Sequence, residues 1–144
     1  MPAATVTWKG GGEFQGSTGA GPAIRLNVPD PVAGRPGPSP MEVLLVAVGG
    51  CTAVDVVSIL QKKRVAITGL EVRVEGERAP DHPRYYTQVH LVYRVTGRQV
   101  PLAAVEHAVE LSLTKYCSAS KSLKAPIDHT IEIVEASEAD AAGE

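Results

Sequence analysis

The chain has 144 residues, a length that suits one domain with a hydrophobic core better than two. Hydrophobic residues make up 44% of the chain, charged residues 21% and aromatic residues 4%, a composition that argues against gross disorder and leaves the core to aliphatic side chains. Fourteen Lys and Arg face 16 Asp and Glu, so the net charge of -2 offers no basic excess for nucleic-acid phosphates or anionic lipid. We therefore expect no nucleic acid and no membrane among the partners.

The amino-terminal segment "MPAATVTWKGGGEF" lacks the basic and apolar regions of a secretory signal, which predicts a cytoplasmic protein. In a reducing compartment its two cysteines, Cys51 and Cys117, remain free thiols. Neither belongs to a CxxC motif or a Cys/His cluster, and the four histidines show no ligand spacing. The sequence thus predicts no metal and no cofactor.

The first elements in chain order are short strands. Residues 5–8 and 12–15 flank "KGGG", and "AIRLNV" at 23–28 continues the pattern, which predicts a small antiparallel meander. The next stretch, residues 29–40, has five prolines and two glycines and cannot hold regular secondary structure. We expect a stiff loop there, of the kind that delivers a side chain to a site.

A long helix is predicted after this loop. Ser39 suits the N-cap, a proline follows at the first helical position, and Glu42 completes the spacing of a capping box. The helix runs to about Lys63, and its residues 43–60 are apolar on nearly every side, which is typical of a central helix or of a membrane span. Asp55 inside the apolar run and the polar caps favour a buried central helix.

The second half of the chain reads as strands and then helices. "LEVRVEGER" at 70–78 and "YYTQVHLVYRV" at 85–95 alternate apolar and polar residues, which predicts a hairpin across the loop "APDHP". A helix is predicted over 101–117, a short helix after it, and a last strand over 128–135. Two adjacent long strands without a helix between them favour an antiparallel α+β fold, with one domain over 1–136 and an acidic, disordered tail over 137–144.

Cys51 follows two glycines inside the long helix. A free cysteine often serves as a small hydrophobic residue in a core. However, Gly49 and Gly50 each cost a helix interior about 0.8–1 kcal/mol relative to alanine. Either close approach of another backbone or room for a substrate beside the sulfur would offset this cost. Asp55 lies one turn further on the same face and needs a partner, either hydrogen-bond donors or a cation that would also stabilise a Cys51 thiolate.

Cys117 lies at the end of the second predicted helix, between Lys115 and Lys121. If its sulfur lies near that of Cys51, the pair suits a peroxidatic and a resolving cysteine. One thiolate would attack a peroxide oxygen and become a sulfenic acid. The other thiol would then condense with this sulfenic acid to form a disulfide.

The stretches "GPSPMEVLLVAVGGCTAVDVVSIL" and "SLTKYCSAS" resemble the two cysteine blocks of the OsmC/Ohr family of thiol-dependent, hydroperoxide-detoxifying proteins, most closely its YhfA-type branch. The resemblance covers nearly the whole chain. It implies an α+β fold with antiparallel sheets around a long central helix, and two chains intertwined in a homodimer with the site at the subunit interface. It also implies that Cys51 is peroxidatic and Cys117 resolving.

The family pattern adds a glutamate and an arginine that hold the thiolate. The position that would carry the glutamate, ten residues before the cysteine, is Met41, and Glu42 lies one residue and therefore about 100° further round the helix. Glu42 remains a candidate catalytic residue beside its capping role. For the arginine, Arg35 in the stiff loop is preferred, and Arg25 in the preceding strand is the alternative.

These observations together predict a cofactor-free thiol peroxidase that reduces organic hydroperoxides in oxidative-stress defence. A dithiol reductant would reopen the disulfide by exchange. The alternative is a non-catalytic dimer of the same fold that binds a small hydrophobic ligand or acts as a redox sensor.

Overall fold

The computed structural model describes residues 1–28, 34 and 37–136. They form two compact units, Met1–Leu44 and Leu45–Glu144, each of which is described by itself. The predicted tail at 137–144 and most of the predicted loop lie outside the described residues. The prediction of a single domain over 1–136 stays a prediction.

The first unit contains a three-stranded antiparallel meander. Its strands are β1 (Thr5–Gly10), β2 (Glu13–Ser17) and β3 (Ile24–Asn27), in the order β1-β2-β3, as the sequence predicts. Gly10 and Gly11 turn the chain between β1 and β2 with φ of 101° and 53°, a region that glycine adopts without a steric penalty. All six residues of β1 are exposed in the chain, including Trp8 at 66%.

Helix α1 (Pro40–Lys62) begins at the predicted capping box. The Ser39 backbone N–H donates to Glu42 Oε1 at 3.0 Å, and the Glu42 backbone N–H donates to Ser39 Oγ at 3.2 Å. The prediction of this start is confirmed, because each residue satisfies a backbone donor that the first helical turn leaves without a carbonyl partner.

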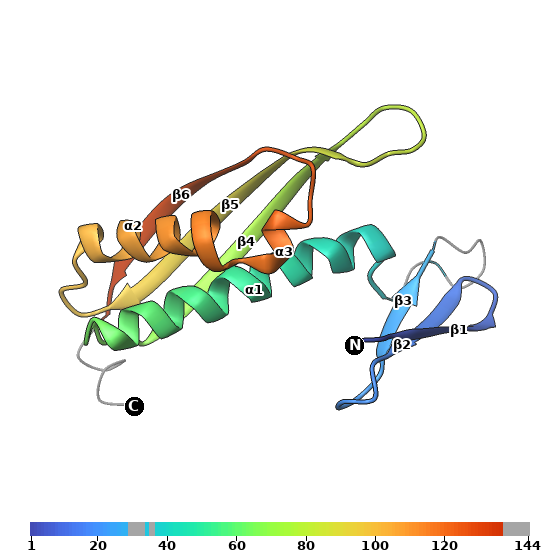
Figure 1. The fold of residues 1–144 in the computed structure, drawn as a ribbon, viewed down its shortest axis with the longest axis horizontal. Coiled ribbons are helices and arrows are strands. Elements are labelled where there is room, and N and C mark those ends of the chain that lie inside the picture. Colours follow the sequence, from blue (N-terminus) through green and yellow to red (C-terminus); the bar gives the residue numbers. More distant parts are fainter. Residues whose placement is uncertain (29–33, 35–36, 137–144) are drawn as a thin grey trace. The chain divides into compact units, whose positions relative to one another are not determined.

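The second unit is built on a mixed sheet of β4 (Gly69–Arg78), β5 (Tyr86–Gly97) and β6 (Ile127–Glu135), in the order β4-β5-β6 (Figure 1). β4 and β5 form the predicted antiparallel hairpin. β6 corrects the expectation of antiparallel sheets, because it pairs with β5 in parallel. The helices between these two strands carry the chain back along the sheet, and such a crossover lets β6 run in the direction of β5. The α+β class is confirmed.

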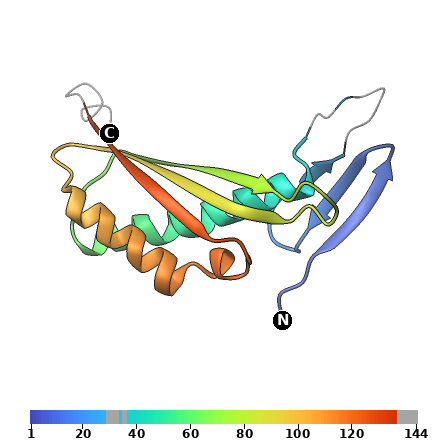
Figure 2. The same ribbon diagram turned by 90° about the horizontal axis from the view of Figure 1, so that it is seen from above.

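The predicted second helix is divided. Helix α2 (Leu102–Leu111) continues into a π-helical turn, η1 (Ser112–Tyr116), and the short helix α3 (Ser118–Lys121) follows Cys117. Within the second unit, α1 and α2 lie on the same face of the sheet (Figure 2). The core between the helices and the sheet includes the following fully buried side chains: Val48, Val56, Leu60, Leu91, Tyr93, Val95, Val105 and Val109.

Only one face of α1 is buried in the chain. Val48, Val56 and Leu60 face the sheet, whereas Val46 and Val54 are 67% and 70% exposed. The expectation of a helix buried on every side is therefore not met within one chain, because the sheet covers a single face. By length and composition α1 could cross a membrane, a test that the core helix of a soluble protein also passes.

Candidate functional site

The second unit brings the two cysteines together. Cys51 lies on α1 and Cys117 lies between η1 and α3, and the two side chains lie close enough for Cys51 to raise the pKa of the Cys117 thiol. Both are free thiols. Cys51 is half-buried, whereas Cys117 is only 4% exposed. The two cysteines, whose proximity the sequence could not establish, are thus neighbours in the chain, and one is half-buried and the other buried.

The surroundings of Cys117 favour its protonated form. Burial, the largest effect, raises the pKa of the Cys117 thiol, and the neighbouring Cys51 raises it further. Hydrogen bonds from Ser120 oppose these effects and lower the pKa, among them the bond from the Ser120 backbone N–H to Cys117 Sγ at 3.5 Å. The net direction is upward, so Cys117 keeps its proton at neutral pH.

The two glycines before Cys51 have different surroundings. A Cβ atom at Gly49 would lie 2.9 Å from Val74 Cγ2, so this glycine allows the close approach of α1 to β4. A Cβ atom at Gly50 would meet nothing within 4 Å, and Gly50 is exposed. Close packing accounts for Gly49, whereas Gly50 leaves open surface next to the half-buried Cys51.

A chain of hydrogen bonds lies beside the two cysteines. Thr52 Oγ1 lies 2.7 Å from Tyr93 Oη and 2.7 Å from Ser112 Oγ. Ser112 Oγ donates to Asp55 Oδ2 at 2.9 Å. Thr52, Tyr93 and Ser112 are fully buried, and Asp55 is half-buried. Of the two partners expected for Asp55, the structure gives a hydrogen-bond donor; among the described residues no lysine or arginine forms a salt bridge with it.

The pKa of Tyr93 is shifted by its burial and by the neighbouring groups of this site. Burial raises the pKa of Tyr93 to about 12; the hydrogen bond to Thr52 lowers it, and negative charge on Cys117 or Asp55 raises it. Sequence reasoning did not single out Tyr93, Thr52 or Ser112. A signal was available, because Tyr93 falls on the apolar face of an alternating strand, and a buried tyrosine hydroxyl needs a partner.

The other predicted site residues are not brought to the cysteines by any described contact. Arg35 lies outside the described residues. Arg25 pairs with Glu13 at 3.0 Å within the first unit. Glu42 holds the capping box, at the start of α1. In the described ranges no group of three or more His, Cys, Asp or Glu side chains is arranged to hold a metal ion.

Comparison with known proteins identifies the family. A family model described as OsmC-like protein matches residues 33–132. The chain is also 43% identical to protein YhfA of Escherichia coli strain K12 over 135 residues, which cover 92% of this chain and 98% of that protein. The chain belongs to the OsmC-like protein family. The same identity is found with protein YhfA of Shigella flexneri.

Solved structures of other proteins share the fold of this chain. A hypothetical protein from Aquifex aeolicus VF5 is 31% identical, with a TM-score of 0.76 over 94% of this chain and 98% of that chain. The organic hydroperoxide resistance protein OhrB of Bacillus subtilis is 16% identical, with a TM-score of 0.65 over 93% of this chain and 98% of that chain. The second likeness concerns the fold alone.

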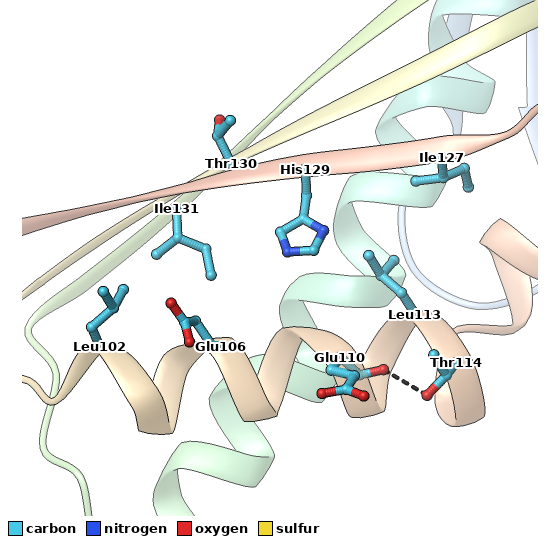
Figure 3. A pocket seen from close by; sticks show the side chains of 9 residues that line it. All are labelled: Leu102, Glu106, Glu110, Leu113, Thr114, Ile127, His129, Thr130 and Ile131. Carbon is cyan, nitrogen blue, oxygen red and sulfur yellow. Dashed lines mark hydrogen bonds between the residues drawn. The ribbon is translucent and has the colours of Figure 1, made fainter.

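Among the described residues of the second unit, one cavity lies between α2 and β6 and another lies along α1. The larger, of about 650 Å³, lies between α2 and β6, with His129 and Ile131 pointing toward α2 and Thr130 pointing away (Figure 3). Neither cysteine lines it. The smaller, of about 460 Å³, lies along α1 and is lined by Ala53, Val54, Val57, Ser58, Gln61 and Leu70. Its lining begins two residues after Cys51 and is mostly apolar.

Proposed function

We propose that this OsmC-like chain is a thiol-dependent peroxidase that reduces organic hydroperoxides, with Cys51 as the peroxidatic and Cys117 as the resolving cysteine. The observation that carries the proposal is the proximity of the two free thiols: Thr52, next to Cys51, is hydrogen-bonded to Ser112, whose carbonyl accepts the Cys117 N–H. Family membership supports a redox role in stress defence, and OhrB of Bacillus subtilis, which shares the fold, is named for organic hydroperoxide resistance. The reaction needs no cofactor, and the proposed location is the cytoplasm.

The chemistry follows from two adjacent thiols. The Cys51 thiolate attacks the terminal oxygen of the hydroperoxide, the O–O bond breaks, and the alkoxide leaves as an alcohol after taking a proton. Cys51 is now a sulfenic acid. The Cys117 sulfur attacks Cys51 Sγ, the S–O bond breaks, and the hydroxyl leaves as water with the Cys117 proton. A dithiol reductant then returns both cysteines to thiols by exchange.

The roles of the two cysteines follow from their different burial. Cys51 is half-buried beside the open surface at Gly50, so a hydroperoxide has access to its sulfur. Cys117 is buried, and its raised pKa keeps it a thiol until a sulfenic acid forms beside it. A buried, protonated sulfur is a poor first nucleophile, but it needs no movement across the molecule to close the disulfide.

The proposed partner is a second copy of the chain in an intertwined homodimer. The outward face of α1 carries exposed Val46 and Val54, and β1 is exposed along its whole length, with Trp8 and Val6 uncovered. Monomeric proteins rarely leave such apolar surface to solvent. A dimer would also place the open surface beside Cys51 near the subunit interface.

The residues that would hold the Cys51 thiolate are part of the proposal. Arg35 is preferred as the cation, with Arg25 as the alternative. Glu42 is proposed as the carboxylate that orients it, in addition to its role in the capping box. A cation close to Cys51 would favour the thiolate and so raise the rate of the first step.

The test is the thiol content and intact mass of the reduced protein after one equivalent of cumene hydroperoxide. Rapid loss of both thiols with formation of an intramolecular disulfide is expected for the native chain. Cys51→Ser should not react, and Cys117→Ser should accumulate sulfenic and then sulfinic acid on Cys51. Two thiols that persist unchanged for about an hour, far beyond the lifetime of a reactive thiolate, would refute the peroxidase.

A second candidate is a dimer that binds a small hydrophobic molecule without catalysis, or a redox sensor. The apolar hollow along α1 favours the binding role. Under this alternative, Arg35→Ala leaves ligand affinity unchanged, whereas under the peroxidase it abolishes the reactivity of Cys51. Titration of native protein and Arg35→Ala with an environment-sensitive apolar dye, beside alkylation of Cys51, separates the two.

A further inference from the structure

The hydrogen bonds that link α1 to η1 have a fixed direction. Ser112 has a single hydroxyl proton and gives it to Asp55, so Ser112 Oγ accepts from Thr52. Thr52 has then used its own proton, and its oxygen accepts from the Tyr93 hydroxyl. The order Tyr93 to Thr52 to Ser112 to Asp55 follows from the last bond, in which the Asp55 oxygen accepts the Ser112 proton.

The same series of hydrogen bonds reaches Cys117 through the backbone of Ser112. Ser112 is the first residue of the π-helical turn η1, and its carbonyl oxygen accepts the Cys117 N–H at 2.7 Å. One residue therefore binds α1 with its side chain and Cys117 with its backbone. Because Cys51 lies directly before Thr52 on α1, the two cysteines sit at the two sides of this connection.

We propose that Ser112 and Asp55 are positioning residues that hold Cys117 within reach of Cys51 while the disulfide closes. The inference rests on the proposed dithiol chemistry. Asp55 acts through Ser112: its carboxylate fixes the direction of the Ser112 hydroxyl, and the hydroxyl fixes the start of η1 against α1. π-helical turns are rare and occur mostly as single turns within α-helices, frequently at functional sites. Loss of the support lets η1 relax and moves Cys117 Sγ away from Cys51.

The test separates the first thiol reaction from disulfide closure without using a peroxide. The aromatic disulfide dithiobis-nitrobenzoate is attacked by the Cys51 thiolate, which forms a mixed disulfide and releases one thionitrobenzoate anion. Cys117 then loses its proton to solvent and attacks Cys51 Sγ, the mixed disulfide breaks, and a second thionitrobenzoate leaves. The two releases are followed by absorbance in a stopped-flow instrument.

Ser112→Ala and Asp55→Ala are expected to slow the second release about tenfold, the effect of losing one buried hydrogen bond of about 1.4 kcal/mol, and to leave the first release unchanged. The matched control is Thr114→Ala, which removes an exposed hydroxyl from the same turn, where it donates to the Glu110 carbonyl at 2.7 Å. Thr114→Ala should release both anions at native rates.

Three results would overturn the proposal: an unchanged second release in Asp55→Ala, equal slowing of both releases, or a native protein that releases a single anion. If Ser112→Ala fails to fold, as judged by circular dichroism, Asp55→Ala at its half-buried position decides between the outcomes. A native protein that closes the disulfide here but does not reduce cumene hydroperoxide would refute the peroxidase and leave the positioning role intact.

Discussion

Gly49 on α1 packs so tightly against Val74 on β4 that a Cβ atom at position 49 would lie 2.9 Å from Val74 Cγ2. A contact this short forces a neighbour to move, and the stiff valine side chain and the sheet beneath it have little room to do so. Gly49 therefore sets the distance between the helix that carries Cys51 and the sheet on which the site is built.

Gly49→Ala is expected to lower the free energy of unfolding by about 1 kcal/mol. Overpacking costs about 1–3 kcal/mol, and the better helix propensity of alanine returns up to about 1 kcal/mol of it. Urea unfolding followed by circular dichroism measures the difference. A variant more stable than the native chain would show that the contact is loose.

Gly50→Ala is the matched control for Gly49→Ala, and it also tests whether Gly50 borders the substrate or a second subunit. No atom lies within 4 Å of a Cβ at this position, so the chain should gain up to about 1 kcal/mol from helix propensity alone. If Gly50 borders the substrate or a second subunit, the variant will instead lose cumene hydroperoxide reduction or dimer formation. Urea unfolding, enzyme assay and analytical ultracentrifugation of the same preparation distinguish these results.

Tyr93→Phe is expected to remove part of the alkaline instability of the chain. The pKa of Tyr93 is raised by burial from its ordinary 10.0 to about 12, so its contribution to stability is complete below pH 10 and is lost as pH rises to about 12. The native chain should lose on the order of 2 kcal/mol more than Tyr93→Phe over this range. Tyr116→Phe, which removes a hydroxyl at a position 50% exposed, is the control for the loss of a tyrosine hydroxyl. Identical curves for the native chain and Tyr93→Phe would contradict the prediction.

Cys51→Ser should lower the pKa of the Cys117 thiol without returning it to the ordinary value. Burial raises this pKa whether or not Cys51 is present, and the neighbouring Cys51 raises it further. The pH at which iodoacetamide alkylates half of Cys117 in a fixed time, read by mass spectrometry, should thus shift downward in the variant. An unchanged midpoint would mean that the two thiols do not interact.

The raised pKa of Cys117 also has a consequence for stability. The contribution of the Cys117 thiol to the free energy of unfolding is fully present below the ordinary thiol pKa. It is lost as pH rises through the higher pKa of the thiol in the folded chain. In Cys51→Ser this loss should begin at the same pH as in the native chain but be smaller and be complete at a lower pH, since the folded-state pKa is lower. Unfolding curves collected beside the alkylation series provide the comparison.

Glu42→Gln separates the capping role of this residue from its proposed catalytic role. Glutamine preserves the capping box, so the free energy of unfolding should change little, whereas Ser39→Ala should cost about 1 kcal/mol. If Glu42 orients the cation at Cys51, Glu42→Gln will slow peroxide reduction at native stability. Native rates with native stability would leave Glu42 with the cap alone.

The local elements were predictable because their signals are local. The capping box at Ser39 and the alternation in β4 and β5 fixed a helix start and two strands from neighbouring residues. The two cysteine blocks likewise indicated the family from short stretches, and the comparisons confirm it. The division of the second helix at Ser112 was missed, since apolar spacing is nearly the same for an α-helix and one π-helical turn.

The sequence by itself determined which segments are helices and strands, which of their faces are apolar, and which thiols are available. Only the tertiary structure decided that β6 runs parallel to β5, that Cys51 meets Cys117, and that Thr52, Tyr93, Ser112 and Asp55 form one chain of hydrogen bonds. The physical reason is that periodicity reports the faces of a single element, whereas the distance between side chains of different elements depends on how those elements pack and on where small residues such as Gly49 allow them to approach.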